Sequence, residues 1–188
     1  MRTRNFLATA CFALTLLIGT SAFAQMEKSV MVGGAQMYPS KNIIENAVNS
    51  KDHTTLVAAV KAAGLVETLQ GKGPFTVFAP TNAAFDKLPM GTVETLLKPE
   101  NLKVLQTILT YHVVVGKLTS EVLTKLIKES KGKAVLKTVS GGTLTAWMKG
   151  KDFYITDENG SSARITIADV NQSNGVIHVI DTVVTPKS

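Results

Sequence analysis

The sequence predicts an α+β fold built as a single domain, with helices mainly in its first part and strands mainly in its second. Two observations support this prediction. Before Gly132 the apolar residues recur mostly at helical spacing, and after it they alternate with polar residues at a period of two. The helices also come before most strands without β-α-β alternation, which favours a largely antiparallel sheet or a wedge of two sheets.

The composition is that of a folded chain. Of the 188 residues, 45% are hydrophobic and 18% are charged, which is too apolar for a disordered protein. No apolar stretch reaches the roughly 18–20 residues of a spanning helix, which excludes a multi-pass membrane protein. We find no internal repeat and no interdomain linker. The net charge of +6 raises the question of an acidic partner.

Residues 1–24 are typical of a signal peptide for export. A basic start, Met1–Asn5, precedes the apolar run Phe6–Ile18, and Ala22-Phe-Ala24 fits the small-x-small rule for cleavage. We expect cleavage after Ala24, a secreted or periplasmic protein, and no membrane span once the peptide is removed. The only cysteine, Cys11, leaves with this peptide, so the exported chain must be stabilised without disulfides.

Residues 25–37 are interpreted as a flexible N-terminal tail, because Gly33-Gly34 lies among scattered polar residues. The tail contains Met26, Met31 and Met37, and thioethers are ligands that suit Cu(I). It has no histidine or cysteine, however, and the methionine spacing is irregular. We therefore favour a tail over a copper site, and we expect no metal and no other cofactor.

The domain itself is expected over residues 38–186 and begins with helices. The first helix opens with Ser40 as its N-cap. The second runs from about Thr54 to Ala63, with Asp52 as its cap and Gly64 as its C-terminal stop. A further helical turn covers residues 66–69.

A short strand over residues 75–79 follows and ends at Pro80. Thr81 is expected to cap a brief helix that reaches Leu88 and buries Phe85. The next segments are expected as helices at 91–97 and 99–109, an extended stretch at 111–115, and a helix at 119–128.

The last part of the chain is predicted to consist of strands. Gly-Gly, Lys-Gly-Lys, Glu-Asn-Gly and Ser-Asn-Gly breaks separate them. The sharpest hairpin signal is Asn174-Gly175, since a tight turn of this type requires positive φ at both positions. The strands are expected at 134–139, 143–148, 153–156, 164–168 and 176–184.

The residues that could support catalysis form no recognisable active site. The chain has no Gly-x-Ser-x-Gly elbow, no Ser-x-x-Lys pair and no phosphate-binding glycine loop. The histidines, His53, His112 and His178, form no pair at metal-ligand spacing. His178 and Asp181 suggest a dyad, but a separation of three on a strand puts them on opposite faces. His112 is expected to be a hydrogen-bonded core residue, and we predict that the protein is not an enzyme.

Five lysines concentrate positive charge near the end of the helix expected at 119–128. They could contact an acidic polysaccharide, lipid headgroups or a partner protein, although a solvated face is the simpler interpretation. Nucleic acid is not expected as a partner, because few aromatic residues lie among the lysines and the protein is exported. The residues are Lys125, Lys128, Lys131, Lys133 and Lys137.

Three segments together resemble the fasciclin-domain family. They are Gly73–Phe85 followed by Leu88-Pro89, then Tyr111-His-Val-Val114, and Asn174–Val184 with Pro186. Their order and intervals are similar to the signature blocks of the family around its central Tyr-His box. The residues that carry the resemblance are Phe75, Thr76, Phe78, Pro80, Thr81, Asn82, Phe85, Tyr111, His112, Asn174, Gly175, His178 and Asp181.

The resemblance implies a fasciclin-like fold, in which an N-terminal helical part packs on a mostly antiparallel β-wedge. It also implies structural roles for Thr81 and His112, within a polar network beneath the core. Family members are mostly secreted or surface-attached modules for cell adhesion and matrix interaction.

We therefore expect an exported, non-catalytic module that binds a cell-surface or extracellular matrix component, either a surface protein or a polysaccharide. We expect it to be a monomer. An alternative is a periplasmic or extracellular carrier of a small ligand or metal ion. The candidate contact residues are Tyr111, His112, Lys125, Lys128, Lys131 and Lys133.

Overall fold

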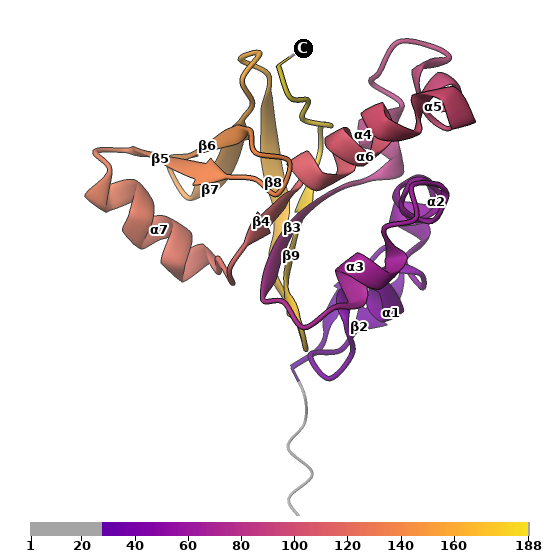
Figure 1. Cartoon of the computed structure of the whole chain (residues 1–188). Coiled ribbons are helices and arrows are strands. Elements are labelled where there is room, and N and C mark those ends of the chain that lie inside the picture. Colours follow the sequence, from indigo (N-terminus) through magenta and orange to yellow (C-terminus); the bar gives the residue numbers. More distant parts are fainter. Residues whose placement is uncertain (1–27, 188) are drawn as a thin grey trace, which may run out of the picture.

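The computed structural model describes residues 28–187. The expected signal peptide at 1–24, its cleavage site and Met26 lie outside these residues. Within them the chain forms one α+β unit in which helices cover both sides of a wedge-shaped sheet (Figure 1). The predicted fold class is therefore confirmed.

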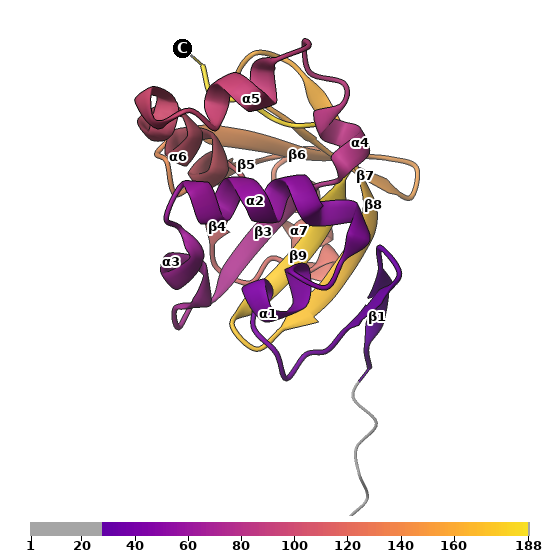
Figure 2. The same cartoon turned by 90° about the vertical axis from the view of Figure 1, so that its right-hand side faces the viewer.

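The N-terminal layer consists of a two-stranded hairpin and short helices. Figure 2 shows α1, α2 and α3 lying across β3 and β9. The elements are β1 (Val30–Val32), β2 (Ala35–Met37), α1 (Ile43–Ala47), the 3-10 turn η1 (Lys51–His53), α2 (Thr54–Ala62) and α3 (Val66–Gln70).

The central sheet has the strand order β4-β3-β9-β8-β7-β6-β5. All neighbours are antiparallel except β3 and β9, which run parallel. The register of β8 against β9 shifts near Ile167, and β5–β7 diverge from β3 and β9 to form the wedge in Figure 1. The strands are β3 (Phe75–Pro80), β4 (Val113–Val115), β5 (Lys133–Lys137), β6 (Thr143–Lys149), β7 (Asp152–Thr156), β8 (Ser162–Gln172) and β9 (Gly175–Ile180).

The remaining helices connect these strands. A run of helices links β3 to β4, and a single helix, α7, links β4 to β5. The helices are α4 (Asn82–Phe85), α5 (Thr92–Leu96), the 3-10 turn η2 (Pro99–Asn101), α6 (Leu102–Tyr111) and α7 (Ser120–Glu129).

The strands β3 and β9 separate two apolar clusters. Because side chains alternate across a strand, β3 sends Val77 to one cluster and Phe78 to the other. The first cluster fills the space beneath α2 and α6, and the second lies between α7 and the strands β5–β8. All residues of β9 are buried, as are all those of β3 after Phe75, which is typical of parallel strands covered on both faces.

The prediction of a flexible tail is wrong for residues 30–37, because these residues form the β1–β2 hairpin. Val32 and Met37 are almost completely buried in the first cluster. Gly33 and Gly34 both have positive φ, as a two-residue hairpin turn requires. The glycine pair was therefore a turn signal, and the burial of Met37 removes it from any surface methionine site.

Several element boundaries also differ from the predictions. Asn42 caps α1 in place of Ser40, because Asn42 and Glu45 bond each other's backbone N–H groups in a capping box. The stretch expected to be extended at 111–115 is strand only from Val113, since Tyr111 ends α6. The last strand stops at Ile180 rather than residue 184.

The hairpin between β8 and β9 exists, but its turn is not the one expected. Gln172 pairs with Gly175, so the loop residues are Ser173 and Asn174. Neither Asn174 nor Gly175 has positive φ. Gly175 is required for a different reason. A Cβ built on it would fall well inside van der Waals distance of the carbonyl oxygen of Phe75, on the neighbouring strand.

We predict that Gly175→Ala destabilises the protein by about 3 kcal/mol, because the new methyl group must push β3 and β9 apart. The matched control is Gly150→Ala, in a turn where no atom lies within 4 Å of the added Cβ and only the positive φ is strained. That change should cost about 1 kcal/mol. Urea unfolding of both variants checks the difference, and equal losses would contradict the close approach at Gly175.

Candidate functional site

The polar residues of the signature segments lie around the ends of β3 and β9. Thr76 is completely buried, and its hydroxyl donates to the carbonyl of Gly116 at 2.6 Å. The same hydroxyl accepts from the N–H of Leu118 at 2.8 Å. This single side chain therefore fixes the loop that joins β4 to α7.

Thr81 and Asn82 connect the end of β3 to the N-terminal helices. Thr81 caps α4 as predicted, because its side chain accepts from the N–H of Ala84. The Asn82 Oδ1 atom accepts from the N–H of Thr55 at 3.0 Å, and its Nδ2 donates to the carbonyl of Lys51 at 2.8 Å. These bonds secure the start of α2 against α4.

Asn174 links three distant parts of the chain. Its Oδ1 accepts from the N–H of Ile43 at the start of α1, at 3.1 Å. Its Nδ2 donates to the carbonyls of Leu69 at 2.8 Å and Gly71 at 3.0 Å, at the end of α3. Its own carbonyl accepts from the N–H of Phe75 at 3.0 Å. Asn174 was predicted to be a hairpin-turn residue, but its side chain bonds the helical layer to the sheet.

Tyr111 is buried at the end of α6. Its hydroxyl donates to the carbonyl of Thr143 at 2.6 Å and accepts from the N–H of Glu158 at 3.2 Å. Burial is the main reason that the pKa of Tyr111 is raised to about 12. The phenol therefore stays neutral and joins α6 to β6 and to the turn that follows β7.

His112 follows directly and is bonded on both ring nitrogens. Nδ1 lies 2.8 Å from the carbonyl of Ile108, and Nε2 accepts from the N–H of Val184 at 3.3 Å. These bonds require a neutral ring protonated on Nδ1. Burial lowers the pKa of His112 to about 4, which keeps the ring neutral near pH 7.

His178, in β9, has similar surroundings. Its Nε2 lies 2.7 Å from the carbonyl of Leu118, its Nδ1 accepts from the N–H of Asp169, and burial lowers its pKa. Asp181 instead accepts from the N–H of Arg164 and the hydroxyl of Thr182. The two residues therefore bond separate partners and do not form a dyad.

The structure contradicts the expectation that Tyr111 and His112 form a contact surface. Their exposed fractions are 0% and 3%, so neither can reach a partner of the folded domain. Both residues were expected in an extended stretch at 111–115, but Tyr111 ends α6 and His112 is its C-cap. The turn of α6 instead directs Tyr111 into the second cluster.

The lysines expected to bind a partner are all exposed. Lys125 and Lys128 lie on α7, Lys131 in the turn after it, and Lys133 at the start of β5. Lys125 faces Glu129 one turn along α7 at 3.9 Å, a weak exposed pair. We call Lys125, Lys128, Lys131 and Lys133 the α7–β5 lysines.

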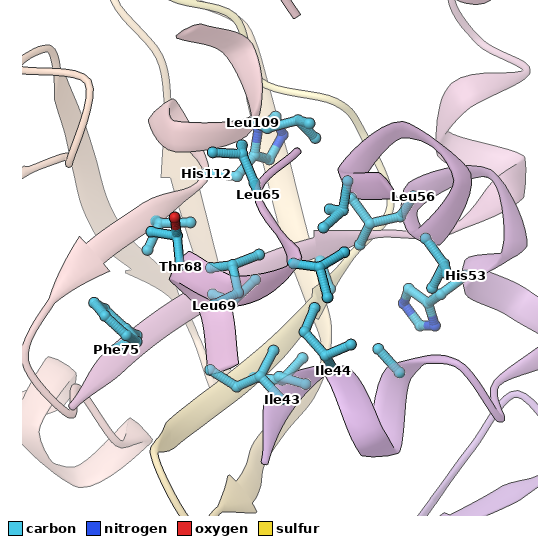
Figure 3. A pocket seen from close by; sticks show the side chains of 18 of the residues that line it. Ile43, Ile44, His53, Leu56, Leu65, Thr68, Leu69, Phe75, Leu109 and His112 are labelled. Atoms are coloured by element: carbon cyan, nitrogen blue, oxygen red, sulfur yellow. The ribbon is translucent and has the colours of Figure 1, made fainter. Parts of the chain in front are cut away.

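An apolar cavity of about 70 Å³ lies between the N-terminal helices and β3 (Figure 3). Ile44, Leu56 and Leu69 are among its lining residues. His53 borders it, with Nδ1 bonded to Ser50 at 2.8 Å and Nε2 without a hydrogen-bond partner among the described residues. The cavity is well below the roughly 300 Å³ at which sites for drug-sized ligands begin.

Among residues 28–187, no group of three or more His, Cys, Asp or Glu side chains is placed to hold a metal ion. Over the same range, none of the helices has the length and apolarity to cross a bilayer.

Sequence reasoning missed an aromatic pair on the outer face of the sheet. The rings of Trp147 in β6 and Tyr154 in β7 stack with their centroids 4.6 Å apart. Both strands were predicted, and their alternation places Leu144, Ala146 and Ile155 inside and the two aromatic residues outside. The signal was therefore present, but the register that brings the rings together could not be read from the sequence.

Comparison with known proteins agrees with the resemblance described above. The family described as Fasciclin domain matches residues 51–186. The chain is 45% identical over 182 residues to Protein sll1483 of Synechocystis sp., covering 95% of this chain and 93% of that protein.

Other relatives and one solved structure are more distant in sequence. The chain is 31% identical to Cell surface glycolipoprotein MPB83 of Mycobacterium bovis, over 89% of this chain and 66% of that one. It is 36% identical to Transforming growth factor-beta-induced protein ig-h3 of Sus scrofa, over 79% of this chain and only 20% of the larger protein. A solved FAS1 domain pair from the insect cell adhesion molecule Fasciclin I has the same fold, with a TM-score of 0.69, 19% identity and coverage of 84% of this chain and 57% of that one.

The buried histidines predict a loss of stability in mild acid. Unfolded histidine binds a proton near pH 6.5, whereas His112 resists protonation in the folded state down to about pH 4. The stabilisation that comes from keeping His112 neutral is therefore complete above pH 6.5 and is lost as the pH falls toward 4. The free energy of unfolding should fall by about 2 kcal/mol between pH 7 and pH 5 from this residue. The pKa values of His53 and His178 are also lowered by burial, so these residues too make the folded protein less stable as the pH falls.

Urea unfolding at several pH values checks this, with His112→Gln as the comparison. The glutamine variant should be less stable at pH 7, but its unfolding free energy should fall less steeply between pH 7 and pH 5. Identical slopes for the two proteins would show that His112 does not titrate as its burial requires.

Proposed function

The chain belongs to the fasciclin domain family, and we propose that it is an exported, non-catalytic adhesion module that binds a polysaccharide or protein of a cell surface or extracellular matrix. The export step is performed by the signal peptide at residues 1–24, with cleavage after Ala24. The names of two relatives, a cell surface glycolipoprotein and a cell adhesion molecule, support a role at a surface.

One observation carries the proposal. The side chains that would have to perform chemistry at the signature segments are buried and bonded inside the fold. Tyr111, His112 and His178 each use their polar atoms on backbone groups of distant elements. What these residues do is stabilise a scaffold, and the interaction must be made by surface side chains.

The α7–β5 lysines are the surface residues that best fit an acidic partner. Three of them follow one another over about two turns from Lys125 to Lys131, and Lys133 opens the neighbouring strand. A cluster of exposed positive charges raises the local concentration of an anionic partner and increases the rate of association. An adhesion module with these residues should bind anionic surfaces with an affinity that falls at high salt.

The test is retention of the purified domain, residues 25–188, on envelope preparations from the source cells. Changing the four α7–β5 lysines to glutamate should reduce retention at least tenfold at low salt, because attraction becomes repulsion. The matched control changes four exposed lysines elsewhere to glutamate, which gives the same net charge. Those residues are Lys51, Lys61, Lys98 and Lys103.

If the wild-type domain is not retained by envelopes at any salt concentration, the adhesion proposal fails. If both fourfold variants lose retention equally, only the net charge matters and the α7–β5 lysines are not the contact site. Thermal unfolding of each variant confirms that it is folded.

The alternative, a carrier, rests on the apolar cavity beneath α2. A cavity of about 70 Å³ with Ile44, Leu56 and Leu69 in its wall would accept a small apolar molecule or part of a longer one. Mass spectrometry of the protein under native conditions distinguishes the two functions. A stoichiometric apolar compound that co-purifies, together with no retention on envelopes, would favour the carrier.

A further inference from the structure

Four side chains form a row across the outer face of the strands β5–β8. Lys133 pairs with Trp147, Trp147 with Tyr154, and Tyr154 with Arg164 in the register of successive antiparallel strands. The row therefore reads cation, aromatic, aromatic, cation. We call these four residues the cross-strand row.

Local bonds hold the aromatic part of the row in place. The planes of Trp147 and Tyr154 are within 17° of parallel. The indole Nε1 donates to the hydroxyl of Thr156 at 2.9 Å, and this hydroxyl lies 2.7 Å from that of Ser162. Because one face of each ring lies on the other ring, the indole of Trp147 has one face, its outer face, that Tyr154 does not cover.

A hollow borders the indole. Its volume is about 390 Å³, and it is lined by Lys133, Thr145, Trp147 and Thr156. This volume is within the range of sites for small ligands. The next residues in register, Thr145, Thr156 and Ser162, form a line of hydroxyls alongside the row.

This face of the sheet is uncovered, whereas the opposite face is packed. Leu136, Leu144 and Ile155 point inward and pack with Leu123 and Ile127 of α7 in the second cluster. Figure 1 shows α7 lying along β5–β7, and these contacts place it on the inner side. Of the described helices, none packs on the side that carries the row.

The charge on this face is predominantly positive. The strands direct Lys133, Lys137, Lys149 and Arg164 outward, and the carboxylate of Asp152 lies among them. Arg164 is 3.0 Å from Asp152 and is partly neutralised by it. In the described part of the chain, Lys133 takes part in no ion pair, so its charge remains available to a ligand.

We propose that the cross-strand row and its hollow bind an acidic polysaccharide, a claim that rests on the proposed function and names the class of partner. The apolar face of a sugar ring packs on the outer face of Trp147 as other apolar surfaces pack on aromatic rings. The threonine and serine hydroxyls exchange hydrogen bonds with sugar hydroxyls. Lys133 binds the carboxylate or sulfate of the sugar, and a neutral sugar would leave this charge unused.

Trp147 is the only tryptophan in the chain, so its fluorescence reports directly on this site. The probe is polygalacturonate, a chain of acidic sugars, titrated into the purified domain at low salt. We expect a saturable change in tryptophan emission that weakens as salt is added. Dextran, a neutral polysaccharide, should bind at least tenfold more weakly.

Lys133→Glu tests the row without disturbing the aromatic pair. It should raise the dissociation constant for polygalacturonate about tenfold, because one charge-assisted contact is lost. Lys103→Glu is the matched control, because Lys103 is exposed and lies outside both the α7–β5 lysines and the cross-strand row. It makes the same charge change on α6, and should alter binding less than twofold. Trp147→Ala, followed by retention on immobilised polygalacturonate, should also lose binding, with its fold checked by circular dichroism.

Three results would overturn the proposal. They are an unchanged emission spectrum with polygalacturonate, equal effects of Lys133→Glu and Lys103→Glu, or a response to a single-stranded oligonucleotide with none to the polysaccharide. Envelope retention separates this proposal from the proposed function. If envelopes still retain Lys133→Glu and Trp147→Ala as well as the wild type, the domain adheres through another surface and only the cross-strand row is refuted. If envelopes never retain the wild type, adhesion itself fails, whatever the fluorescence shows.

Discussion

The parallel pairing of β3 with β9 is the constraint on which the rest of this structure depends. The two strands are far apart in the sequence, since Phe75 pairs with Gly175, 100 positions later, and their side chains supply both apolar clusters. Bringing them together closes a loop that contains most of the domain, with an entropy cost that the burial of both faces must offset. Gly175 permits the close approach, and every element between the strands is arranged around the pair.

Polar side chains complete this arrangement at the strand ends. Asn174 bonds the ends of α1 and α3 to the pair, Thr76 fixes the loop after β4, and His112 bonds the segment that follows β9. A buried polar group without partners is costly, so each such residue specifies one position for the elements that it joins. The residues that carry the family resemblance are therefore occupied inside the fold. Binding must come from other surfaces, such as the α7–β5 lysines and the cross-strand row.

Sequence reasoning succeeded where the signal is local. The Thr81 cap, the Gly64 stop and the alternation of β5–β8 each depend on a few neighbouring residues, and the structure has all of them. It failed where contacts between distant parts of the chain determine the local structure or the burial of a residue. Residues 30–37 are ordered because Val32 and Met37 reach the core, and Tyr111 is buried because α6 continues to it. Trp147 and Tyr154 became a pair only through strand register, which neither segment reveals alone.

Amide hydrogen exchange under native conditions tests the central role of the β3–β9 pair most directly. If the pair joins both clusters, the amides of β3 and β9 should be the slowest to exchange, with a free energy equal to that of global unfolding. The amides of α2 and of β5–β7 should exchange at the same rate or faster. Exchange of β9 through a smaller opening, while β5–β7 stay protected, would show that the wedge is stable without the pair and would contradict this account.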